Sequence, residues 1–375
     1  MNRKWMLICH EMRTMRWFLL AGCICALVMS GLLYVAMAGN YQAVMNPGQE
    51  QYNLEFFGAY GSYFSEQLAL FFRYGVIAGL LAFAFMSIIQ FSELHNSRSR
   101  EYLASLPFTQ GECFAVKAGL GYGAITVSCL VLSAGVLFVR SRFITTLIKV
   151  NIVRPDFEIT YGNETIWHTL RSLALFWLTL MAIYSIYITV QSLVGQGIIA
   201  GMIGAGAMLA PLELGMVILH EYGIWLLYIK DMVRHQAVTN LYSHTTNILG
   251  VFFGMATGTS VSTSDETGCW NTYTYYENMW ILFTSLAVIL IGCTLLAYIV
   301  NRKRDLAYAG TLVPMKGARI AIGLGCGICF GTAITEFIFI DSAVDGDMVL
   351  KAIICLVLSA GIFLGCQKLL KRIVK

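Results

Sequence analysis

The chain has 375 residues, of which 58% are hydrophobic and 12% are charged, and its mean hydropathy is +0.69. The charged fraction is about half that of an ordinary soluble domain, so the composition excludes a water-soluble globular protein and indicates a chain that crosses a membrane several times. The formal net charge of +4 is modest, and no nucleic-acid partner is expected.

The apolar runs predict the fold class. A helix needs about 20 mostly apolar residues to cross the hydrocarbon, because its backbone groups must bond within the helix. We therefore expect an all-α, polytopic integral membrane protein with about eight transmembrane helices, near 17–38, 67–91, 117–139, 172–193, 196–219, 279–300, 318–340 and 348–368. A cleavable signal peptide is the alternative for the first run, but that run is long and lacks a convincing small-residue cleavage site.

The basic residues predict the orientation. With both termini inside, 16 lysines and arginines flank the spans on the cytoplasmic side and 7 on the other side. Basic residues accumulate on the cytoplasmic side of membrane proteins, so we expect a multi-pass protein of the cytoplasmic membrane with both termini in the cytoplasm.

Residues 1–16 precede the first span and suggest an interfacial N-terminal helix. Apolar residues recur there at helical spacing, and basic residues lie on or near the other face: Trp5, Ile8, Cys9, Met12 and Met15 against Arg3, Lys4, His10, Arg13 and Arg16. Such a helix binds anionic membrane lipids. The alternative is a plain basic flank to the first span.

The long polar loop at 92–116 joins the second and third runs. Its pattern predicts a short helix from about Glu93 to Leu103, a stop at Pro107 and a new helical start around Gly111. A solvated turn is the alternative, but a turn needs only a few residues, and this segment has apolar residues at helical spacing.

A second long excursion, 220–278, lies between the fifth and sixth runs. It contains two apolar pieces, EYGIWLLYIKDMV and TNILGVFFGMATG, which are too short to cross but can form extracellular or re-entrant helices. The polar stretch from Thr257 to Cys269 is expected to be a surface loop.

Two stretches carry a resemblance to a known family. The run Phe91, Leu94, His95, Arg98, Ser105-Leu106-Pro107 and Glu112 resembles the first cytoplasmic loop of ABC-2 type permeases, in the pattern found in Firmicutes. The segment YIVNRKRDLAYAGTLVPM at 298–315 is similar to the Tyr-x-x-Arg-Lys/Arg-x-x-x-Ala-Gly segment that follows the sixth span in related permeases. The chain departs from the pattern at Gln110-Gly111, where the family usually has a basic residue.

The resemblance implies a domain organisation. It identifies 17–300 as an ABC-2 type six-helix core, 301–317 as a cytoplasmic basic linker and 318–375 as a C-terminal transmembrane helix pair. The resemblance identifies the N-terminal helix as the connecting helix of the family. The loop at 92–116 becomes the coupling helix that docks on an ATPase subunit, through Leu94, His95, Arg98, Glu101, Leu103, Leu106, Pro107 and Glu112.

The function implied is that of a permease subunit of an ATP-binding cassette exporter. It would move an amphipathic peptide, antibiotic or lipid-like molecule, driven by a separate ATP-binding subunit, and would pair with a second copy or a similar permease. The alternative is a membrane-embedded enzyme, or a regulatory membrane subunit without transport.

The motifs argue against an enzyme. The phosphate-binding loop G-x-x-x-x-G-K-S/T is missing from the sequence, so the chain is not expected to hydrolyse ATP itself. His220-Glu221 begins like H-E-x-x-H, but Ile224 stands at the second histidine position, so no metal site is expected. Cys326-x-x-Cys329 has redox spacing in apolar, glycine-rich surroundings that favour packing. No cofactor is expected.

Four charges fall inside the predicted spans: Arg73, Glu213, Glu336 and Lys351. Snorkelling to the outer interface is the simpler interpretation for each, and a role in the pathway is the alternative. Glu336 and Lys351 are predicted to lie at similar depth and to form an ion pair.

Glycines repeat every four residues in three of the runs, at Gly119/Gly123, Gly197/Gly201 and Gly323/Gly327/Gly331. This spacing places small residues on one helix face and predicts close helix packing.

Overall fold

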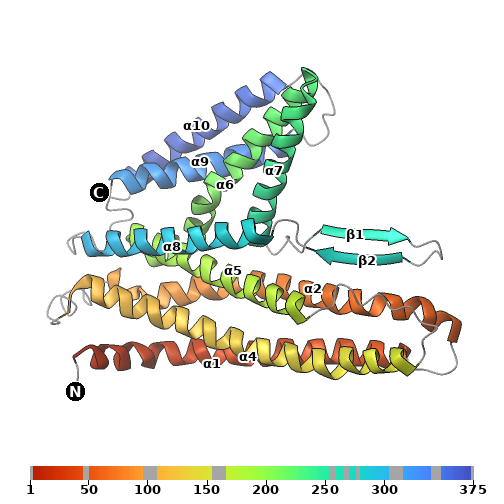
Figure 1. Cartoon of the computed structure of the whole chain (residues 1–375). Coiled ribbons are helices and arrows are strands. Elements are labelled where there is room, and N and C mark those ends of the chain that lie inside the picture. The colour runs from red at the N-terminus through yellow and green to blue at the C-terminus, as the bar shows by residue number, and fades with distance from the viewer. Residues whose placement is uncertain are drawn as a thin grey trace. The chain divides into compact units, whose positions relative to one another are not determined.

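The computed structural model describes residues 3–44, 50–95, 108–153, 166–252, 259–264, 270–275, 279–303, 316–338 and 348–372. It confirms a helical protein (Figure 1), and several of its helices are long and apolar enough to cross a membrane. The helices are α1 (Arg3–Val44), α2 (Glu50–Gln90), the 3-10 turn η1 (Ser92–Leu94), α4 (Gln110–Val153), α5 (Ile166–Leu193), α6 (Gly197–Tyr228), α7 (Met232–Phe252), α8 (Met279–Lys303), α9 (Lys316–Ile338) and α10 (Met348–Arg372).

Each of the eight apolar runs lies within one described helix, apart from one or two residues at an end of three of the runs. Five stretches in the described part of the chain are long and apolar enough to cross a membrane: Trp5–Gly39, Gln67–Gln90, Gln110–Phe143, Ile166–Leu193 and Met279–Lys303. Many of their large apolar side chains face outward, among them Leu27, Leu130 and Val288. Outward apolar side chains suit hydrocarbon as the surrounding solvent.

The first helix does not break at residue 16. α1 has 42 residues, so it is about 63 Å long, against about 30 Å for the hydrocarbon core. The predicted interfacial segment and the first span therefore form one continuous helix, part of which extends beyond the hydrocarbon. On its first turns Trp5 and Met12 are exposed, whereas Leu7 and Met15 are buried.

The chain divides into two compact units. The first contains Met1–Gly79, Gly119–Met181 and Val251–Phe283. In it α1 packs closely on α4, since a side chain added at Gly22 or Gly135 would overlap Ser128 or Ser30. The Phe72 ring of α2 stacks on the Phe176 ring of α5, with centroids 4.5 Å apart.

The first unit also holds the one departure from an all-α fold in the described residues. Strands β1 (Thr259–Ser264) and β2 (Trp270–Tyr275) form an antiparallel hairpin in which Thr259 pairs with Tyr275 and Ser264 with Trp270. The polar stretch that the sequence suggested as a surface loop is therefore partly a strand. Thr, Val, Trp and Tyr residues are common in strands, and the prediction of a surface loop did not take this preference into account.

The second unit contains Leu80–Ala118, Ala182–Gly250 and Thr284–Lys375. In it α9 packs against both α6 and α10. Gly327 permits this contact with α10, because a Cβ there would stand 2.7 Å from the Ser359 carbonyl oxygen. The predicted close packing is confirmed for the Gly323, Gly327 and Gly331 series and at Gly201, which meets Ile88. It is not seen at Gly119 and Gly123, where an added Cβ would meet no atom of the described residues within 4 Å.

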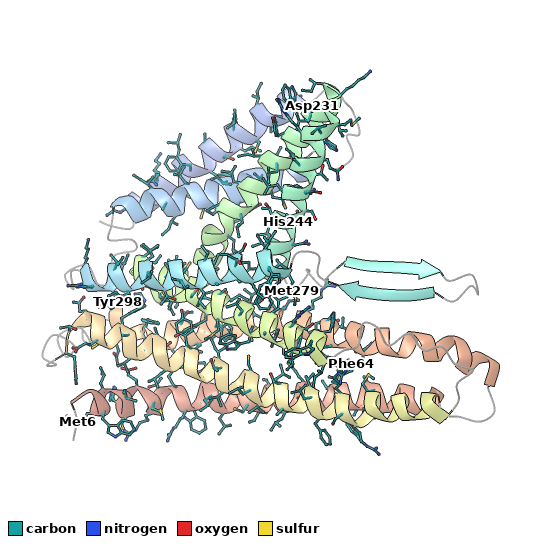
Figure 2. The ribbon with its side chains drawn as sticks, viewed as in Figure 1. Met6, Phe64, Asp231, His244, Met279 and Tyr298 are labelled. Carbon is teal, nitrogen blue, oxygen red and sulfur yellow. The ribbon has the colours of Figure 1, made fainter. Side chains whose placement is uncertain are left out.

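The apolar pieces of the excursion at 220–278 are helical. The first continues α6 to Tyr228, and the second ends α7 at Phe252. The turn between the two helices carries Lys230 at a φ of 59° and Asp231 (Figure 2). Asp231 Oδ1 accepts a hydrogen bond from the Arg234 amide and so caps the first turn of α7.

Candidate functional site

The candidate site lies where α2 ends and α4 begins, on either side of the predicted coupling loop. Phe91 is fully buried immediately after α2, and its ring lies 5.9 Å from that of Phe114 on α4. The Tyr298 ring of α8, labelled in Figure 2, lies 6.3 Å from the Phe114 ring on the other side. This aromatic packing fixes the two helix ends from which the loop departs.

The start of α4 carries a capping box. The Glu112 amide donates to Thr109 Oγ1 at 3.2 Å, and Glu112 Oε2 accepts from the Thr109 amide at 3.0 Å. These reciprocal bonds satisfy two backbone donors that a helix start leaves unpaired. The predicted helical start around Gly111 is confirmed, since α4 begins at Gln110. Glu112, proposed from the resemblance as a docking residue, therefore also has a local structural role.

Lys117 is the centre of the site. Its side chain is only 6% exposed, and its Nζ donates to the Gln90 carbonyl oxygen and to Glu93 Oε2, both at 2.9 Å. The Gln90 amide nitrogen donates in return to the Lys117 carbonyl oxygen. A buried ammonium is tolerated only when its charge is paired and its protons are bonded, and these contacts supply both. They tie the end of α2 to the first turns of α4.

Tyr184 extends these contacts into α5. This residue is fully buried, and its hydroxyl donates to Gln90 Oε1 at 2.6 Å. Gln90 thus bonds to α4 through its amide nitrogen and to α5 through its oxygen, so its side chain is fixed at both ends.

Gln191, near the end of α5, makes a second set of hydrogen bonds. They join His95, which follows η1, to the start of α6. His95 Nε2 lies 2.9 Å from Gln191 Oε1. The Gln191 amide nitrogen donates to the Gly197 carbonyl oxygen at 3.1 Å and to Ser87 Oγ at 3.3 Å. Gln191 therefore joins the base of the loop to the first residue of α6.

Two further bonds join α5 to α8. The Asn301 side-chain nitrogen donates to Ser192 Oγ, and Thr189 Oγ1 donates to the Cys293 carbonyl oxygen at 2.8 Å. We use the name Lys117 network for the connected residues Gln90, Glu93, Lys117 and Tyr184, together with the neighbouring group Ser87, His95, Gln191, Ser192 and Asn301.

The structure describes only part of the predicted docking set. His95 and Glu112 are described and lie at the two ends of the loop. Leu94 is the last residue of η1, but its side chain lies outside the described residues. The rest of the predicted short helix lies outside them too, with Arg98, Glu101, Leu103, Leu106 and Pro107.

The four predicted intramembrane charges differ in their surroundings. Arg73 is exposed on α2. Glu213 is half-buried on α6, where its Oε1 accepts a hydrogen bond from the Thr332 hydroxyl of α9 at 2.9 Å. Glu336 and Lys351 belong to α9 and α10, and their side chains lie outside the described residues, so the proposed ion pair stays a prediction.

Sequence reasoning missed most of the Lys117 network, although a signal for it was present. Gln90, Gln191 and Asn301 interrupt or end apolar runs, and Lys117 begins one. Polar residues at such positions need partners when buried, but the sequence does not say which ones pair. The Thr-Gln-Gly-Glu capping box at 109–112 could have been read directly.

Metal chemistry finds no support in the described part of the chain. No group of three or more His, Cys, Asp or Glu residues there could hold a metal ion. The His220 ring packs near that of Tyr242, with centroids 5.6 Å apart. The site consists of hydrogen bonds and one ion pair, and this arrangement can hold helices together and transmit a displacement between them.

Comparison with known proteins adds no family assignment. No protein-family model matches the chain, and no curated protein or solved structure matches it significantly.

Proposed function

We propose that this protein is the permease subunit of an ATP-binding cassette exporter, multi-pass in the cytoplasmic membrane with both termini inside. It moves an amphipathic molecule across the membrane and is driven by a separate ATPase subunit. Eight helices cross the bilayer: the five long candidate spans and α6, α9 and α10. Two such permease chains, identical or similar, form the pathway.

One observation carries the proposal: the two ends of the loop at 92–116 are joined to the long helices by hydrogen bonds between buried polar groups. A loop that only reverses the chain needs no such attachment. Lys117 and Gln90 join the two ends of this loop, and Tyr184 joins them to α5. The resemblance of the loop to a coupling helix supports the same interpretation.

The network gives the loop a mechanical connection to the rest of the second unit. Movement of the loop without its helices would break the Lys117–Glu93 pair and leave an ammonium buried without its partner, which is costly. Movement together with its helices preserves these bonds. A displacement of the loop by an ATPase would therefore be passed to the ends of α2 and α4, through Tyr184 to α5, and through Gln191 to the start of α6.

Joint purification with an ATPase tests the proposal. The chain is co-expressed with each ATP-binding cassette ATPase found to be encoded near its gene and is purified through a tag on the permease. We expect a stable complex whose ATP hydrolysis differs from that of the ATPase alone and is abolished by replacing the phosphate-binding lysine of the ATPase. If the ATPase does not associate and the chain is folded, the permease assignment is wrong, and a membrane enzyme or regulatory subunit becomes the better hypothesis.

A further inference from the structure

Glu213 is the only charged residue between Gly197 and Leu219 of α6. The charge lies near the middle of a helix of 32 residues, far from either end. A carboxylate at such a position is costly in an apolar environment and is a candidate functional group by default.

The carboxyl group faces α9. Its Oε1 accepts a hydrogen bond from the buried Thr332 hydroxyl at 2.9 Å, and the Cys329 thiol lies nearby. The same thiol lies 3.4 Å from the Gly206 carbonyl oxygen of α6. The carboxyl group is therefore held by one neutral donor, the Thr332 hydroxyl, which orients it without compensating a negative charge.

No basic side chain compensates that charge in the described part of the chain. The ion pairs found there involve Glu11, Glu93 and Asp231, and none involves Glu213. Glu93 differs in this respect, because it has Lys117 as its partner. Glu213 is half-buried and not fully enclosed, so an external group can approach it.

The surroundings restrict what that group can be. Hard metal cations require several oxygen ligands, typically about six, whereas the side-chain oxygens that the described residues join here are those of Glu213 and the Thr332 hydroxyl. A weakly hydrated organic cation needs only an opposite charge and apolar neighbours, and the apolar stretch of α6 supplies the neighbours. We infer that Glu213 binds the cationic group of an amphipathic organic cation, with Thr332 positioning its carboxylate. The role of this site in export rests on the proposed function.

Binding of a hydrophobic cation tests the inference without the ATPase. The full chain in nanodiscs of zwitterionic lipid is dialysed against radiolabelled tetraphenylphosphonium, and binding to empty nanodiscs is subtracted. We expect saturable binding that Glu213→Gln weakens about tenfold or more, as expected for loss of a charge-assisted contact. Tetraphenylborate has the same shape and the opposite charge, and it should show no saturable binding.

Asp231→Asn is the matched control. It also replaces an acid by its amide in the second unit, at the turn after α6, and its side-chain oxygen can still cap α7. It should leave tetraphenylphosphonium binding unchanged. Saturable binding that is equal in Glu213→Gln and the unmodified chain, or binding to lipid alone, would overturn the inference.

A second measurement uses the unmodified chain, in case Glu213→Gln does not fold. Dicyclohexylcarbodiimide modifies carboxyl groups in apolar surroundings, and mass spectrometry locates the product. We expect tetraphenylphosphonium to protect Glu213 from modification; undiminished modification at saturating cation contradicts the inference. Because neither measurement includes the ATPase, a failure of the permease proposal leaves their result intact, and their failure leaves the permease proposal intact.

Discussion

Lys117 Nζ lies 2.9 Å from Glu93 Oε2, although Glu93 is at the start of the long loop and Lys117 directly follows its end, 24 positions later in the sequence. The pair is asymmetric. The Lys117 side chain is 6% exposed, whereas that of Glu93 is 29% exposed. Water can therefore solvate Glu93 far better than Lys117 if the pair is broken.

The asymmetry predicts unequal costs for two substitutions. Glu93→Gln leaves a buried ammonium with a weaker partner and should lower the free energy of unfolding by about 2 to 3 kcal/mol, whereas Lys117→Met should cost about 1 kcal/mol. Denaturation of detergent-solubilised protein with sodium dodecyl sulfate measures both. Arg302→Gln, at an exposed position, is the control and should change the value by less than about 0.5 kcal/mol. Equal costs would contradict the asymmetric role.

Glu112 allows capping to be separated from docking. Glu112→Gln keeps an oxygen that can accept from the Thr109 amide, whereas Glu112→Ala removes it. We expect the alanine variant to lose about 1 kcal/mol of stability and the glutamine variant much less. If both variants keep their stability but lose the ATPase in a pull-down, Glu112 acts through docking and not through the capping box.

The coupling segment itself is tested at Leu103 and Leu106. Replacing both with Asp should leave membrane insertion intact but release the ATPase, because apolar contact worth roughly 25 cal/mol per Å² is lost and charge is placed in the interface. A pull-down through the permease tag measures the retained ATPase. Full retention by the double variant rules out the coupling-helix assignment.

The topology is tested by labelling single cysteines placed at Ser342 and at Ala307 in a cysteine-free chain. We expect an impermeant thiol reagent added to intact cells to label position 342 and to leave 307 unlabelled. These positions flank α9, so one experiment reports whether that helix crosses the membrane and in which direction. Labelling at 307 alone reverses the orientation and removes the coupling loop from the cytoplasm.

The predicted ion pair between Glu336 and Lys351 calls for a double-mutant cycle. Glu336→Gln and Lys351→Met should each reduce the yield of folded protein in detergent, and the double variant should recover much of the loss, because neither charge is then left alone. Fluorescence-detected gel filtration measures the yield. Losses that simply add would show that the two charges do not interact.

The helices could be predicted from the sequence because each apolar run is a local signal. α4 begins at Gln110, one residue from the predicted start, since Pro107 and the capping residues lie next to each other in the chain. The sequence could not predict which side chains pair between different helices. Tyr184 and Gln90 are 94 positions apart, and only the packing of α5 against α2 makes them partners. For the same reason Gly119 and Gly123 have the spacing of a packing face but meet no neighbour among the described residues, because spacing does not say which face is covered.

The burial of α5 limits where the sequence can accept insertions or deletions. In its most apolar window 89% of the residues are buried, against 11% in that of α1. One residue inserted into α5 between Tyr184 and Thr189 would turn the preceding part of the helix by about 100° relative to the part that follows. The bond of Tyr184 to Gln90 would then be out of register with the bonds of Thr189, Gln191 and Ser192 to their partners in the same unit. The same insertion in the outward-facing part of α1 would mostly exchange one apolar side chain for another against lipid. Natural length variation is therefore expected to fall in α1 and the loops and to avoid α5.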